Sequence, residues 1–185
     1  MRLILLGAPG SGKGTQGQRL AARLGVPHIA SGDLLRAEVR DRTELGRLVA
    51  GYLDSGQLVP DELTFKLVVP VVLAAARAGG YVLDGFPRSV AQAVQAEEVA
   101  AESGAGPERV IFLAVPEAVL VKRLSERAAT SGRSDDTPKV ITDRLRVFEA
   151  ETRPLVEHYR TRGLLREVAA DRSTDEVAEA ISAVL

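Results

Sequence analysis

The stretch from Gly7 to Thr15 has the make-up of a phosphate-binding loop between a strand and a helix. It reads Gly-Ala-Pro-Gly-Ser-Gly-Lys-Gly-Thr and nearly matches G-x-x-x-x-G-K-[ST]. The glycines allow backbone N–H groups to converge on phosphate oxygens, and Lys13 adds a positive charge. The residue after the lysine should carry a hydroxyl for magnesium, but it is Gly14, and the hydroxyl follows at Thr15. A tight strand–helix turn without a ligand is the alternative, which the Gly-Lys pair and its context disfavour.

A second candidate site is the segment Asp84-Gly85-Phe86-Pro87-Arg88, which follows a short buried strand. Nucleotide-binding domains place a carboxylate at such a strand end, where it holds magnesium directly or through water. Arg88 could clamp a phosphate with two parallel hydrogen bonds. The alternatives are a helix-capping aspartate and a solvated surface arginine. Of the 24 basic residues only four are lysine, so a single arginine is a weak indication and a set is stronger.

Strands alternate with helices along the chain, which predicts an α/β fold with a parallel sheet. We expect Ser31 or Asp33 to cap the second helix, Pro138 to begin a late helix, and Pro154 to bend it. Ligands of such sheets bind at the carboxyl ends of the strands, and both motifs and Ser31 follow such ends. The strands are expected at 2–6, 28–30, 81–84, 110–115 and 164–168, and the helices at about 13–24, 31–54, 61–78, 89–102, 117–128, from 137 and from 174 or 175.

The composition is that of an ordinary soluble protein of one domain. The chain has 185 residues, of which 45% are hydrophobic and 26% charged, and its net charge of −1 indicates neither a nucleic-acid nor a membrane partner. It contains no cysteine, which excludes disulfides and thiolate metal sites. The apolar run at residues 1–6 is too short for a signal peptide or a membrane span. We therefore expect a cytoplasmic protein.

Three segments together resemble the signature segments of the adenylate kinases, in the nucleoside monophosphate kinase family. They are Gly7 to Thr15, Ser31-Gly32-Asp33-Leu34-Leu35-Arg36, and Asp84 to Arg88. The family carries a glycine after its loop lysine, so Gly14 is part of the resemblance. The resemblance covers nearly the whole chain. It implies a P-loop three-layer α/β fold with a central five-stranded parallel sheet flanked by helices, a small AMP-binding helical insertion and a short lid loop.

The resemblance also implies a role for individual residues. Lys13, Arg88, Arg123, Arg133 and Arg144 would act on the transferred phosphoryl group. A hydrated Mg²⁺ would accompany ATP, held by its phosphates and by waters ordered by acids such as Asp84 and Asp33. ATP would contact Gly10, Ser11, Gly12, Lys13, Gly14, Thr15, Arg127 and Arg172, and AMP would contact Ser31, Arg36, Gln57, Leu58, Val59, Gly85, Phe86, Pro87, Arg88, Gln92, Arg133 and Arg144.

Two positions depart from the wider family. Only residues 128–132 separate Arg127 from Arg133, which resembles the short-lid form and leaves no room for a separate lid domain or a zinc site. Ser31 stands where threonine is usual, and it keeps the hydroxyl.

The resemblance implies a division of the chain into a core at 1–29, 60–126 and 137–185, an NMP-binding segment at 30–59 and a short lid at about 127–136. Asp135 and Asp136 resemble lid acids, but they could also simply precede a helix.

The implied reaction is the reversible, magnesium-dependent conversion of ATP and AMP into two ADP by a monomer. No histidine is needed as a base, and we expect His28 and His158 to be structural. The nearest alternative is a UMP/CMP kinase, which Ser31 and Gln92 disfavour. The others are a P-loop nucleotide-binding protein without catalysis and a P-loop kinase for a non-nucleotide metabolite.

Overall fold

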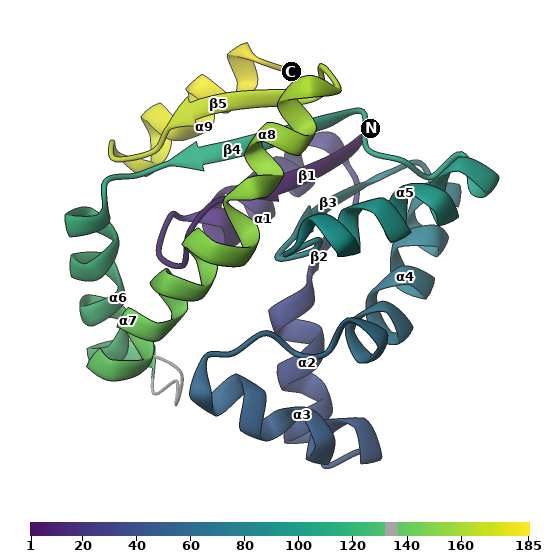
Figure 1. Ribbon diagram of the computed structural model, residues 1–185. Helices are drawn as coiled ribbons and strands as arrows, with labels where there is room; N and C mark the ends of the chain where they lie inside the picture. Colours follow the sequence, from purple (N-terminus) through teal and green to yellow (C-terminus); the bar gives the residue numbers. More distant parts are fainter. Residues whose placement is uncertain (132–136) are drawn as a thin grey trace.

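The computed structural model describes residues 1–131 and 137–185 and places five strands in one parallel sheet (Figure 1). The strand order is β2-β3-β1-β4-β5, so β1 lies in the centre. This confirms the predicted five-stranded parallel sheet. The strands are β1 (Arg2–Leu6), β2 (His28–Ala30), β3 (Tyr81–Asp84), β4 (Arg109–Ala114) and β5 (Leu165–Ala169).

Helices cover both faces of the sheet because its strands are apolar on both sides. On one face Leu3 and Leu5 pack with residues of α1 (Lys13–Leu24) and α9 (Thr174–Ala183). On the other face Ile4 and Leu6 belong to a larger cluster with residues of further helices. Those helices are α4 (Asp61–Arg77), α5 (Val90–Ser103), α6 (Glu117–Ser131), α7 (Pro138–Val147), the π-helical turn η2 (Phe148–Thr152) and α8 (Pro154–Thr161).

Two helical projections leave the sheet at the end where the strands finish (Figure 1). One consists of α2 (Ser31–Arg40) and α3 (Glu44–Ser55), which meet in a small apolar cluster around Leu35, Val49 and Val59, against which Leu63 and Leu67 of α4 also pack. The other consists of α6 and α7. Within the described residues, no helix is both long and apolar enough to cross a membrane.

Three details differ from the helix boundaries expected from the sequence. The N-cap of α2 is Ala30, and neither Ser31 nor Asp33 caps the helix, because Ser31 is already its first residue. Helix α6 continues to Ser131 rather than ending near 128, so the first part of the expected lid segment is helical. The bend expected at Pro154 is preceded by the π turn, in which the Arg153 N–H donates to the Phe148 carbonyl at 2.8 Å.

Candidate active site

A cavity of about 590 Å³ lies at the carboxyl ends of the strands and reaches both projections. Its walls are rich in positive charge, although the net charge of the chain is −1. A basic cavity of this kind attracts polyanionic ligands such as nucleotide phosphates. Among the described residues, the charged side chains of the lining are Lys13, Arg36, Arg88, Arg123, Arg127, Arg144 and Arg172, opposed by Asp33 and Asp84.

The glycine loop forms the floor of this cavity between β1 and α1. Gly12 is the N-cap of α1 with a φ of 93°, a backbone conformation that favours glycine, and no side chain caps the helix. The first N–H groups of α1 therefore remain available to an anion at the positive end of the helix. Ser11 Oγ is buried there without a hydrogen-bond partner among the described residues. Each of these features fits a bound phosphate.

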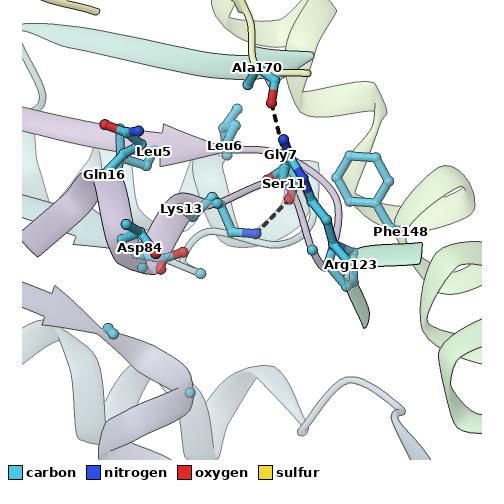
Figure 2. A pocket seen from close by; sticks show the side chains of 18 of the residues that line it. Leu5, Leu6, Gly7, Ser11, Lys13, Gln16, Asp84, Arg123, Phe148 and Ala170 are labelled. Carbon is cyan, nitrogen blue, oxygen red and sulfur yellow. Dashed lines mark hydrogen bonds between the residues drawn. The ribbon is translucent and has the colours of Figure 1, made fainter. Parts of the chain in front are cut away.

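Lys13 extends from the start of α1 along this loop (Figure 2). Its ammonium group donates to the carbonyl oxygens of Gly7 at 2.9 Å and Ala8 at 3.1 Å. The pKa of Lys13 is lowered to about 8, chiefly by burial; Asp84 opposes this shift, and Arg88, Arg144 and Arg127 contribute to it. The lysine is thus held in a position where an anion would restore its ordinary preference for the charged form.

Asp84 ends β3 and faces the glycine loop. A Cβ added to Gly14 would lie 4.0 Å from Asp84 Oδ2, so the carboxylate is next to the residue that replaces the usual hydroxyl. Asp33 also lines the cavity, but its carboxylate accepts a hydrogen bond from Arg36. Within the described residues, no three His, Cys, Asp or Glu side chains gather as a metal-binding group. The donors therefore fit a Mg²⁺ ion that is coordinated largely by phosphate and water, with Asp84 as the nearest carboxylate.

The loop after β3 holds Arg88 through several hydrogen bonds. The backbone N–H of Arg88 donates to Gln92 Oε1 at 2.7 Å, and its Nε donates to the Gly85 carbonyl at 2.8 Å. The same Gly85 carbonyl accepts from Ser31 Oγ at 2.6 Å. Gly85 has a φ of 78°, and a Cβ there would lie 2.7 Å from Ser31 Oγ, so the close approach requires glycine. The guanidinium is therefore fixed at the wall that faces Lys13.

Three further arginines of the cavity come from α6 and α7. Arg123 donates to the carbonyl of Ala170 at 2.9 Å and to that of Arg172 at 3.4 Å, which ties α6 to the loop after β5 (Figure 2). Arg127 and Arg144 line the same cavity and are close enough to Lys13 to lower its pKa. Gly56, at the end of α3, packs on Arg144, because a Cβ there would lie 2.6 Å from Arg144 Cγ.

The structure brings most of the predicted site residues to this one cavity. Arg133, Asp135 and Asp136 lie outside the described residues. Five other predicted residues do not line it: Gln57 is exposed at the end of α3, whereas Ser31, Val59, Phe86 and Gln92 are buried. Those that line it are Gly10, Ser11, Gly12, Lys13, Gly14, Thr15, Asp33, Arg36, Leu58, Asp84, Gly85, Pro87, Arg88, Arg123, Arg127, Arg144 and Arg172.

Gln92, which is expected to contact AMP, is buried beside the Arg88 loop. Its amide is already engaged on both sides: Oε1 accepts from the Arg88 N–H, and Nε2 donates to Asp61 Oδ1 at 2.6 Å. Asp61 was expected only to begin a helix, and its pairing with Gln92 was not predicted. A pairing between two side chains 31 positions apart has no local signal.

His158 lies away from the phosphate-binding groups, whereas His28 is one of the residues that line the cavity. His158 Nε2 and Glu97 Oε1 are 2.8 Å apart beside α5 and α8. His28 is on the edge strand β2 and packs against Gly17, where an added Cβ would lie 2.4 Å from its Nε2. The structural roles expected for both histidines stay predictions.

Comparison with known proteins gives one consistent answer. Residues 5–164 match the family model described as "Adenylate kinase". The chain is 45% identical over 184 residues to the adenylate kinase of Clavibacter michiganensis subsp. michiganensis, covering 100% of this chain and 92% of that protein. It is 45% identical to "Adenylate kinase 1" of Nostoc sp., covering 100% of this chain and 98% of the relative. It is 37% identical over 212 residues to the adenylate kinase of Lachnospira eligens, covering all of both chains.

Proposed function

Because the chain belongs to the adenylate kinase family, we propose that it catalyses the reversible transfer of a phosphoryl group from ATP to AMP, which gives two molecules of ADP. The observation that carries the proposal is the convergence of seven cationic side chains on one cavity. They come from the glycine loop, from the Arg88 loop, from the segment after β5 and from both helical projections. Two nucleotides that meet phosphate to phosphate need such a concentration of positive charge.

In the proposed reaction an oxygen of the AMP phosphate attacks the γ-phosphorus of ATP. A new oxygen–phosphorus bond forms while the bond from that phosphorus to the β–γ bridging oxygen breaks. The AMP phosphate is already ionised near neutral pH, so the protein needs no general base. The catalytic work is positioning and charge stabilisation, which we assign to Lys13, Arg88, Arg123, Arg133 and Arg144.

We assign the two nucleotides to opposite sides of the cavity. The ATP phosphates would lie over the free N–H groups of the glycine loop, with Arg127 on the lid side and Arg172 near the base. AMP would lie against the Arg88 loop and α2, with its phosphate held by Arg36, Arg88 and Arg144. A Mg²⁺ ion bound with ATP supplies charge neutralisation at the ATP phosphates, and Asp84, and Asp33 through water, would hold its hydration shell.

Closure of the two projections completes the proposed mechanism. The NMP-binding segment at 30–59 would fold over AMP, and the short lid at about 127–136 would fold over ATP. Closure excludes water, which could otherwise accept the phosphoryl group. The apolar cluster around Leu35, Val49 and Val59 joins α2 to α3, so these two helices would move together. The proposal takes ATP, AMP and ADP as the partners of a cytoplasmic monomer, with no nucleic acid or membrane partner.

A panel of acceptors tests the proposal. The protein is mixed with ATP and Mg²⁺ and with AMP, UMP, CMP, GMP or no acceptor, and ADP formation is measured. We expect rapid ADP formation with AMP and at least a hundredfold less in every other mixture. A preference for UMP or CMP would replace the proposal with the pyrimidine kinase alternative. Equal rates with and without acceptor would indicate an ATPase.

A further inference from the structure

Thr152 links two parts of the cavity, the loop after β3 and the helical segment that follows α7. It is the last residue of η2, and its hydroxyl donates to the backbone carbonyl of Arg88 at 2.7 Å, across 64 positions of the chain. Thr152 also lines the cavity. The acceptor therefore belongs to Arg88, an arginine of the cavity whose charge acts on Lys13.

Arg88 is held on three sides, and Thr152 supplies a contact from the C-terminal half of the chain. Its N–H is bonded to Gln92 of α5, and its Nε is bonded to Gly85 of its own loop. Both of these bonds are local and keep the loop in shape. The Thr152 bond is different because it fixes the loop relative to the helix that carries Arg144.

The π turn explains how one continuous helical segment presents both Arg144 and Thr152 to the cavity. The two residues are eight apart, which in an uninterrupted α-helix of 3.6 residues per turn leaves their side chains about 80° apart around the axis. The turn η2 is closed by an i to i+5 hydrogen bond between the Phe148 carbonyl and the Arg153 N–H. Each of its residues therefore rotates the chain around the helix axis by a smaller angle than a residue of an α-helix does. The extra residue in this turn brings Thr152 back toward the helix face that carries Arg144. Val147 and Phe148, which lie between Arg144 and Thr152 in the sequence, also line the cavity.

We propose that Thr152 is a positioning residue for phosphoryl transfer. Its hydrogen bond sets the distance between Arg88, on the loop after β3, and Arg144, on the helix after the lid. The inference rests on the proposed function, because the anion held between the two arginines is taken to be the AMP phosphate. A loop without this bond would keep Arg88 but would let it drift from Arg144, so the AMP phosphate would lose affinity and alignment.

Three substitutions test this inference. Thr152→Val keeps the shape and removes the hydroxyl, and Thr152→Ser keeps the hydroxyl. Thr142→Val is the matched control, because Thr142 is an exposed threonine of α7 whose hydroxyl donates to the Pro138 carbonyl one turn earlier, at 3.2 Å. For each protein kcat, KM for AMP, KM for ATP and the thermal midpoint are measured, and AMP binding is measured by calorimetry without turnover.

We expect Thr152→Val to lower kcat/KM for AMP and to weaken AMP binding about fivefold to tenfold, with KM for ATP changed less than twofold. Thr152→Ser and Thr142→Val should stay within twofold of the unsubstituted protein. In an Arg88→Ala background, Thr152→Val should have no further effect on AMP binding, because the two residues act through one contact.

Three results would overturn the inference: equal losses for ATP and AMP, a Thr152→Ser variant as weak as Thr152→Val, or full additivity with Arg88→Ala. The unsubstituted protein reports on the proposed function separately. If it binds AMP without transferring a phosphoryl group, the proposed function fails while the binding comparison still decides the role of Thr152. If it neither binds AMP nor turns over, both fail.

Discussion

The buried ammonium group of Lys13 predicts that ATP binding weakens steeply above pH 8. The pKa of Lys13 in the free protein is about 8, chiefly because of burial, so the side chain loses its proton over a range in which ordinary lysines stay charged. A bound triphosphate favours the ammonium form and keeps it protonated. ATP binding at high pH must therefore first recover a proton, and the apparent Kd rises with pH.

The magnitude follows from the protonated fraction. A group with a pKa of about 8 is about 76% protonated at pH 7.5 and about 3% protonated at pH 9.5. If only the ammonium form binds, the Kd for ATP rises about 25-fold between these two values. With an ordinary lysine pKa of 10.5, the same change in pH would raise the Kd by only about 10%. The two cases are easily separated.

Titration calorimetry with ATP and Mg²⁺ at pH 7.5, 8.5 and 9.5 measures the effect, and two variants assign it. Lys13→Met should bind weakly with little dependence on pH, because no titrating ammonium remains. Lys13→Arg keeps a charge over the whole range, so its Kd should also be flat. A Kd for the unsubstituted protein that changes less than twofold would refute the argument from burial. An equal pH dependence in Lys13→Met would refute the assignment to Lys13.

The remaining predictions concern the Arg88 loop and the metal. Arg88→Ala should lose at least a hundredfold in kcat/KM for AMP while its thermal midpoint changes little, whereas Arg146→Ala, at an exposed position paired with Asp143, should match the unsubstituted protein in the same kinetic assay. Gly85→Ala should raise KM for AMP at least tenfold and lower the free energy of unfolding, measured in urea, by about 1–2 kcal/mol. The reason is that a φ of 78° is strained for alanine and that the added Cβ would lie 2.7 Å from Ser31 Oγ. An unchanged KM would show that the close approach of Gly85 to Ser31 is not needed. Removal of Mg²⁺ should abolish turnover, and elemental analysis should find no stoichiometric zinc, whereas one zinc per chain would contradict the short-lid interpretation.

The features that the sequence by itself determined arise from the residue pattern of short segments. The loop from Gly7 to Lys13 is specified by glycines that permit its backbone and by an apolar run before it, so it could be placed between a strand and a helix. The five strands follow from short segments that contain apolar residues, and their number and parallel arrangement were predicted correctly. Asp84 and Arg88 could be assigned to the site because strand ends of a parallel sheet meet at one edge.

The tertiary structure decided how side chains distant in sequence share their hydrogen bonds. The sequence did not show that Gln92 turns to Asp61 and to the Arg88 backbone, or that Thr152 reaches the Arg88 carbonyl. It did not predict the π turn either, because the shift from an i to i+4 to an i to i+5 bond costs little locally and is selected by packing on the core. Such choices depend on which partners the folded chain brings within about 3 Å, and no spacing along the chain records them.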